Sequence, residues 1–361
     1  MKQSKHNIYY SPKEVRAILE RSIDTALDGL KGYCNDPVSD FTRCRKLPAR
    51  TLIECIMSFS NYSSIGELSH FFVGQGEMPS ASALSQRRQL LDPDIFKRIN
   101  NLFVSAFDDH TTINGYHILA QDGSDVNIPF MDDKTKTEKH DAKSFCQYHV
   151  NALYDCLNKV FYDWSIDAAS KKREVNALIS ILKDRNYPKN SIFTADRGYE
   201  SYNLMAHFIE NDTKFVIRVK DIHTKSGLMT NIKTEEGAFD MRINRTLTSL
   251  QTKEIKADKE KYIFVPSTSN FDFLDENRDF YDLSFRAVRF KISEDTYETV
   301  VTNLSEEEFK TEDFKELYHY RWNEETAFNK LKYTIGLVYF HARKRKLIQQ
   351  EINAAFLMYN V

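Results

Sequence analysis

The segment LYHYRWNEETAFNKLK combines side chains that can bind phosphate and metal ions. If it is helical, at about 100° per residue, four polar side chains share an arc of about 60°: Tyr318, Arg321, Glu325 and Lys332. An arginine can hold a phosphate through two hydrogen bonds, a lysine offers a point charge, and a carboxylate is a hard oxygen ligand for a divalent cation. A solvated helix face with ion pairs four residues apart is the alternative interpretation.

The other side of this segment is apolar and should face a core. Four apolar side chains lie between about 180° and 280° from Tyr318: Leu317, Ala327, Phe328 and Leu331. Glu324 falls at about 240°, toward this apolar arc, whereas Glu325 lies on the polar arc. We therefore expect Glu325 to be the functional acid, with Glu324 as its rival.

The elements before this segment begin with helices. Residues 12–107 carry apolar side chains at helical spacing, and Pro12 after Ser11 is typical of a helix start. The segment SASALSQRRQLL begins with serines that can cap a helix and carries Arg87 and Arg88. It could be a recognition helix that lies against DNA, and an ordinary surface helix is the alternative.

From Gly115 onward the pattern changes to strands. YHILAQDG, QYHVNALYD and KVFYDWSID are strand-like, and the last two suggest a hairpin. A helix near residues 173–184, the strand SIFTAD, a helix over residues 201–210 and the strand KFVIRVK follow. This order predicts an α/β fold with a ribonuclease-H-like mixed sheet, in which several strand ends meet.

The sequence predicts three regions in the chain. Residues 1–110 would form a helical domain that binds DNA ends, and residues 111–220 and 304–361 would form the ribonuclease-H-like catalytic core. Residues 221–303 are rich in strand formers and charge, which indicates a β-rich insertion with half-exposed antiparallel strands.

The spacing Tyr-x2-Arg-x3-Glu-x6-Lys is satisfied in full by Tyr318, Arg321, Glu325 and Lys332. It resembles the YREK signature of bacterial insertion-sequence transposases of the DDE class. AQDGSDVNIP is similar to that family's first-aspartate strand, and TADRGYES with FVIRVK is similar to its second-aspartate region. The resemblance covers roughly residues 80–361 and implies an acidic triad of Asp122, Asp196 and Glu325.

The resemblance implies cleavage at transposon ends, followed by transfer of the 3′-hydroxyl strands into target DNA. Breaking a phosphodiester bond needs an activated nucleophile and a stabilised leaving oxygen, which two Mg²⁺ ions about 3.5–4 Å apart can supply. The acidic triad would hold these ions, with Mn²⁺ as a substitute. The expected partners are double-stranded DNA, namely terminal inverted repeats and target DNA, and a second copy of the chain in a homodimer on paired ends.

Several cations are expected to contact DNA beside the triad. Besides Tyr318, Arg321 and Lys332 of the signature, the candidates are Arg197, Lys330, Arg87 and Arg88. Asp125 is a rival to Asp122, but three positions along an extended strand place the two on opposite faces. We prefer Asp122 because it ends the apolar run as the family's aspartate does.

The composition is that of a globular protein, with 41% hydrophobic and 28% charged residues. No apolar run is long enough to span a membrane, and the start has no signal-peptide core, so we expect a cytoplasmic, nucleoid-associated protein. A net charge of −2 argues mildly against DNA binding, but residues 326–350 contain no acid and several cations. The five cysteines show no zinc spacing and are expected to be free thiols.

Two alternatives stay open at this point. One is a ribonuclease-H-like nuclease without transposition activity, and the other is a catalytically inactive, transposase-derived DNA-binding protein. The sequence ends at AAFLMYNV, in what is predicted to be a helix, so a truncated copy is also expected. The intact acidic triad argues against decay.

Overall fold

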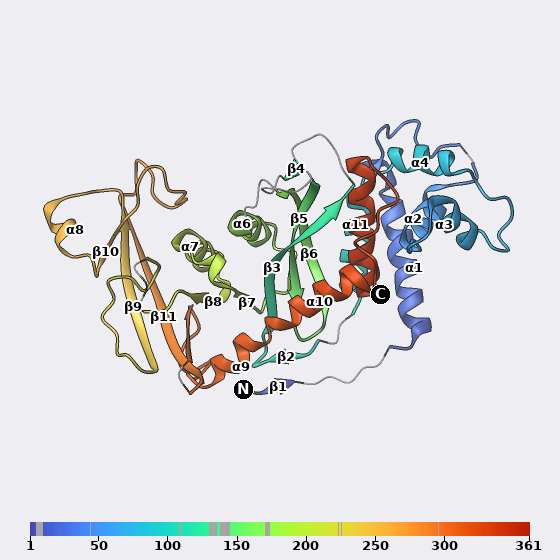
Figure 1. The fold of residues 1–361 in the computed structure, drawn as a ribbon. Coiled ribbons are helices and arrows are strands. Elements are labelled where there is room, and N and C mark those ends of the chain that lie inside the picture. Colours follow the sequence, from blue (N-terminus) through green and yellow to red (C-terminus); the bar gives the residue numbers. More distant parts are fainter. Residues whose placement is uncertain are drawn as a thin grey trace.

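The structure of the protein is a computed structural model. It describes residues 1–4, 10–43, 45–107, 110–129, 136–137, 145–169, 174–222, 224, 226–294 and 296–361. The helices of residues 12–104 lie at one end of the molecule, a large sheet fills the centre, and the long strands within residues 239–293 form the other end (Figure 1).

One mixed sheet of ten strands organises the chain. Its central strands run in the order β6-β5-β3-β7-β8, and their bounds are β6 Val160–Ala168, β5 Phe145–Asp155, β3 His117–Ile128, β7 Ser191–Ala195 and β8 Lys214–Val219. β5 is antiparallel to β3 and β6, whereas β7 is parallel to β3 and β8. Three antiparallel strands followed by two helical crossovers form a ribonuclease-H-like mixed sheet, which confirms the predicted fold class.

The strands of residues 239–302 continue the same sheet. Their bounds are β9 Phe239–Thr248, β10 Tyr262–Phe264, β11 Phe280–Ser293 and β12 Thr296–Thr302, with the short helix α8 Lys253–Ala257 between β9 and β10. β12 is antiparallel to β8, with Thr299 opposite Val219, and β11 is antiparallel to both β12 and β9. The inserted strands therefore widen the central sheet rather than fold as a sheet of their own. Short strands β1 Gln3–Ser4 and β2 Thr112–Ile113 pair with each other, and β4 Lys136–Thr137 pairs with β5.

The N-terminal region is helical, as predicted. Its elements are α1 Pro12–Asp28, η1 Leu30–Tyr33, α2 Ala49–Met57, α3 Ser64–Phe71, α4 Ala81–Leu90 and α5 Asp94–Val104. α1 begins at Pro12 with a capping box, because Ser11 and Glu14 bond each other's backbone amides. The final helix, α11 Arg345–Asn360, stands between these helices and the sheet, where it contacts α5, α2 and β6 (Figure 1).

The two faces of the sheet carry separate cores. Alternate side chains of β3 point to opposite faces, so Ile118 and Ala120 pack with residues of the C-terminal helices, while Leu119 packs with Leu178 and Met205. The C-terminal layer contains α9 Asp313–His319, α10 Trp322–Tyr333 and α11, and the opposite layer contains α6 Glu174–Asp184 and α7 Tyr202–Glu210.

The signature segment is two helices, not the single helix that the periodicity predicted. α9 ends at His319 and α10 begins at Trp322. At the junction the amides of Arg321 and Glu324 donate to carbonyls three residues earlier, which is the tighter bonding of a 3₁₀ turn. A 3₁₀ turn advances by about 120° per residue, so side chains three positions apart eclipse each other. The Tyr318 ring accordingly lies beside Arg321, with the guanidinium carbon 5.7 Å from the ring centre.

No helix in the described ranges is long and apolar enough to cross a membrane. The expected free thiols are found at Cys34, Cys55, Cys146 and Cys156, and Cys44 lies outside the described residues.

Candidate active site

Asp122 lies on β3 and faces α10. Its Oδ1 accepts a hydrogen bond from the amide of Gly123 at 2.8 Å, and its Oδ2 lies 3.5 Å from Nη1 of Arg321. Burial raises the pKa of Asp122, and the negative charges of Asp196 and Glu325 raise it further. The hydrogen bond from Gly123 and the positive charge of Arg321 lower the pKa but do not offset the increase. The carboxylate is thus crowded by like charges, which is the electrostatic condition that a bound cation relieves.

Asp196 lies at the same sheet edge as Asp122. The parallel strands β3 and β7 pair Gln121 with Ala195, and the two aspartates follow these residues directly. Asp196 caps the short helix η3 (Arg197–Tyr199), where the amide of Gly198 donates to its Oδ1 at 2.7 Å. This bond orients one carboxylate oxygen and leaves the rest of the group for another partner.

Arg321 is the cation that joins the site. Only 5% of its side chain is exposed, and its Nη2 donates to Oε1 of Glu325 at 2.9 Å while Nη1 faces Asp122. Burial alone would lower the pKa of Arg321, but the charges of Tyr318, Glu325 and Asp122 outweigh it and raise that pKa. A guanidinium between two carboxylates from separate elements stands where a positive charge is most stabilised.

Glu325 and Glu324 differ in access. The Glu325 side chain is 42% exposed, whereas Glu324 is fully buried and neither of its carboxylate oxygens makes a well-formed hydrogen bond within the described residues. Burial raises the pKa of Glu324 well above its usual range, and the nearby Asp122 charge adds to this effect. Glu325 is therefore the acid that can reach a ligand in solution.

The donor set suits a divalent cation in type and charge. Three carboxylates from β3, η3 and α10 offer hard oxygen ligands, and the Arg321 guanidinium already marks a cation position between two of them. Among the described residues, no three acidic, histidine or cysteine side chains stand close enough to hold one ion as they are. The acidic triad thus fits Mg²⁺ by the chemistry of its oxygen ligands. In this conformation, its three carboxylates lie too far apart to bind one ion together.

Comparison with known proteins identifies the family. A family model described as the transposase DDE domain matches residues 113–361. The chain belongs to this family. No curated protein matches the sequence. Among solved structures, the chain is similar to a piggyBac transposase in a synaptic complex with hairpin DNA, with 12% identity, 99% of this chain and 68% of that chain covered, and a TM-score of 0.40, which is too low to carry an argument.

Three of the side chains expected to contact DNA are exposed or half-buried in this DDE transposase domain: Lys332, Lys330 and Arg197. Lys332 is half-buried on α10, and burial lowers its pKa although the Asp125 charge counteracts the shift. Lys330 on the same helix and Arg197 next to Asp196 are exposed. These side chains are accessible to a phosphate backbone.

Three other predicted DNA contacts, Tyr318, Arg88 and Arg87, are buried or partly buried. Tyr318 is only 2% exposed, and its ring packs beside the Arg321 guanidinium. Arg88 is 3% exposed and binds Glu351 of α11 at 2.7 Å. Arg87 is partly buried, donates to the carbonyl of Leu47, and lies over the Phe41 ring. α4 therefore packs on α11 through Arg88.

The sequence analysis missed a cluster on the opposite face of β3, which we call the His149 cluster (Asp125, His149 and Glu174). Nδ1 of His149 lies 2.7 Å from Asp125, and Nε2 forms an ion pair at 3.0 Å with Glu174 of α6. Strand register places Asp125 directly opposite His149. The predicted hairpin joined QYHVNALYD to KVFYDWSID, so it did not bring His149 opposite Asp125, and the position of Glu174 follows only from the packing of α6.

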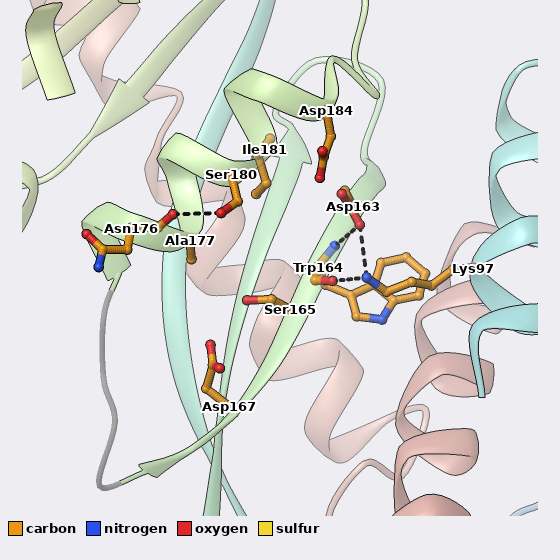
Figure 2. Close-up of a pocket in the computed structure, with 10 residues that line it drawn as sticks. All are labelled: Lys97, Asp163, Trp164, Ser165, Asp167, Asn176, Ala177, Ser180, Ile181 and Asp184. Carbon is orange, nitrogen blue, oxygen red and sulfur yellow. Dashed lines mark hydrogen bonds and ion pairs between the residues drawn. The ribbon is translucent and has the colours of Figure 1, made fainter. Parts of the chain in front are cut away.

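A pocket between α5, β6 and α6 lies apart from the acidic triad. Figure 2 shows Asp163, Asp167 and Asp184 around it, with Lys97 bound to Asp163 at 3.2 Å and to the carbonyl of Trp164. Of these three acids Asp163 is paired with Lys97, and none belongs to the triad. The pocket therefore lies where α5 packs against the core, and it is not part of the candidate active site.

Proposed function

We propose that the chain is a DNA transposase that cleaves transposon ends and transfers the 3′-hydroxyl strands into target DNA. The observation that carries this proposal is the placement of Asp122 and Asp196 at one sheet edge, with Arg321 linking Asp122 to Glu325. The family membership supports the reaction class. Such an enzyme acts in the cytoplasm, on nucleoid DNA.

Asp122, Asp196 and Glu325 would hold two Mg²⁺ ions, with Mn²⁺ as a substitute. When bound, the metal supplies a nucleophile at neutral pH and neutralises charge on the phosphate. Arg321 and Lys332 would bind the phosphate oxygens on either side of Glu325, Arg321 through its planar fork and Lys332 as a point charge. Because Arg321 is buried, its contact to phosphate would be strong and would depend on close approach of the DNA.

Each of the three predicted regions would have its own function. Residues 1–110 would bind the terminal inverted repeats, residues 111–220 and 304–361 would carry catalysis, and residues 221–303 would be the insertion whose strands widen the core sheet. Exposed Lys330 and Arg197 would contact the DNA backbone, whereas Arg88, whose guanidinium binds Glu351, would hold α4 on α11. A homodimer would bring two ends together before strand transfer.

The test is an assay on supercoiled DNA that carries the terminal repeats flanking the gene. Asp122→Ala, Asp196→Ala and Glu325→Ala should each lower cleavage at least about 100-fold while DNA binding remains, because most affinity comes from phosphate contacts elsewhere. Asp184→Asn, which removes an exposed carboxylate outside the site, is the matched control. Mg²⁺ or Mn²⁺ should support the reaction and Ca²⁺ should not, since Ca²⁺ accepts looser geometry.

The same assay separates the alternatives. Cleavage without joined products would indicate a nuclease that does not transpose. Binding to the repeats with no metal-dependent cleavage would indicate an inactive DNA-binding descendant. Normal cleavage by all three alanine variants would overturn the proposed site.

A further inference from the structure

Glu174 is the first residue of α6, and its two carboxylate oxygens face in different directions. Oε1 forms the 3.0 Å ion pair with Nε2 of His149. Oε2 faces the backbone of Gly198, where an added Cβ would lie 3.8 Å from it and 2.9 Å from Oδ1 of Asp196. The carboxylates of Glu174 and Asp196 therefore both approach the same backbone position.

The holder of Glu174 is rigid. Only 2% of the His149 side chain is exposed, and its other nitrogen bonds Asp125 at 2.7 Å. Asp125 and His149 are opposite residues of paired strands, so their positions are set by the sheet register. The imidazole cannot rotate without breaking one of its two contacts, and its Nε2 keeps Oε1 of Glu174 within ion-pair distance.

Two glycines beside the aspartates make room for this arrangement. A Cβ at Gly123, next to Asp122, would lie 2.6 Å from Cε1 of His149 and 2.9 Å from Oε1 of Glu174. A Cβ at Gly198 would lie 2.9 Å from Oδ1 of Asp196. Any side chain at Gly123 would push His149 and Glu174 away from the sheet edge that carries the two aspartates.

We propose that Glu174 is a fourth carboxylate of the candidate active site and acts as a positioning residue for the metal ligands around Asp196. His149 and Asp125 hold Glu174, and Glu174 adds negative charge next to Asp196 on the side of the sheet away from Arg321. A charged group beside the metal ligands can raise the affinity for a bound cation without binding the cation itself. This inference rests on the proposed function, because it requires a divalent ion at the acidic triad.

An acid at the start of a helix also stabilises that helix through its dipole. That role needs neither the ion pair to a buried histidine nor a side-chain-free residue at Gly123. The two roles differ in a measurable way: a helix-capping acid affects stability alone, whereas a positioning acid affects metal affinity.

The test is Mn²⁺ binding by the full chain without DNA, measured by titration calorimetry, together with the thermal unfolding midpoint in metal-free buffer. Glu174→Gln should weaken Mn²⁺ binding about 10-fold or more with little change in the midpoint, since outer-shell partners contribute on that scale. Asp184→Asn, which removes one exposed acid at the other end of α6, should bind Mn²⁺ like the wild type (Figure 2). His149→Gln should weaken binding in the same direction by a smaller factor, because it loosens Glu174 without removing it.

Asp196→Asn provides the reference for site-specific binding. If the wild type binds Mn²⁺ no more tightly than Asp196→Asn, the metal site of the proposed function is wrong, and this inference falls with it. If binding depends on Asp196 but Glu174→Gln binds like the wild type, the proposed function stands and only the role of Glu174 is wrong. A lower midpoint with unchanged Mn²⁺ affinity would assign Glu174 to helix stability and overturn the inference. If Glu174→Gln does not fold, the folded His149→Gln variant decides by the same comparison.

Discussion

Glu324 and Glu325 are consecutive residues of α10 that meet opposite surroundings. Glu324 is 0% exposed and lies near Asp122, whereas the side chain of Glu325 is 42% exposed and binds Arg321 at 2.9 Å. The step of about 100° between neighbours on a helix turns one carboxyl into the core and the other toward the site. On the same helix, Glu325 can therefore bind a ligand, whereas Glu324 is enclosed in the core and has a raised pKa.

We expect Glu324→Gln to retain cleavage and to stabilise the fold at high pH. Burial raises the pKa of Glu324 well above its usual range. At a pH above the ordinary glutamate pKa, the folded chain therefore keeps a proton on Glu324 that the unfolded chain has released. The wild type therefore loses stability as pH rises, and the neutral amide does not. The gain in unfolding free energy should be about 1–3 kcal/mol at pH 8 and smaller at pH 5, measured by denaturant titration. An equal effect at both pH values would mean that Glu324 is ionised in the fold.

Arg321→Ala should weaken both the site and the fold. The substitution leaves Asp122 and Glu325 without their cation, and removing one partner of a buried ion pair costs about 3–5 kcal/mol when both partners are buried and less here, because Glu325 is partly exposed. The salt dependence of DNA binding should fall by about one unit as one phosphate contact is lost. Lys332→Ala, measured alongside, should change the salt dependence similarly with a smaller loss of stability. An unchanged slope in both variants would place these cations in local ion pairs only.

Arg88→Ala should destabilise the fold without changing the salt dependence of DNA binding. Arg88 on α4 binds Glu351 and the carbonyl of Leu347 on α11, each at 2.7 Å, and its loss leaves Glu351 buried without this partner. The expected cost is about 3–5 kcal/mol in unfolding free energy, measured by denaturant titration. Arg43→Ala, an exposed arginine of the same N-terminal region, is the control and should leave stability unchanged. A lower salt slope at unchanged stability would restore α4 as the recognition helix.

His341 should make the junction of the N-terminal helices and α11 sensitive to pH. Its ring lies 3.2 Å from both Glu67 and Glu351, and Arg88 joins the same network. Burial alone would lower the pKa of His341, but the two carboxylates outweigh it and raise the pKa. Because the folded pKa exceeds the unfolded one, this stabilisation is complete below about pH 6.5 and is lost as pH rises through the folded pKa.

The measurement compares the wild type with His341→Gln in denaturant titrations at pH 6 and pH 9. The wild type should be the more stable protein at pH 6, and the difference should shrink at pH 9. A constant difference would show that His341 contributes by packing against Phe59 rather than by its charge.

The sequence by itself predicted the residues of the candidate site and determined the order of the elements that carry them. The spacing of Arg321, Glu325 and Lys332 marks one helix face, and strand-forming runs that end at Asp122 and Asp196 predict a shared sheet edge. These conclusions depend on the periods of helix and strand, which are properties of short segments. The order of strands and helices was sufficient for the fold class for the same reason.

Only the tertiary structure decided which charged side chains are available. Arg88 looks like a surface cation in its own segment, but its partner Glu351 is 263 positions away and packs on it through α11. Tyr318 is buried beside Arg321, and the packing of α6 brings Glu174 to His149 and to the backbone of Gly198 beside Asp196. Burial and ion pairing depend on contacts between distant elements, so no local period in the chain encodes them.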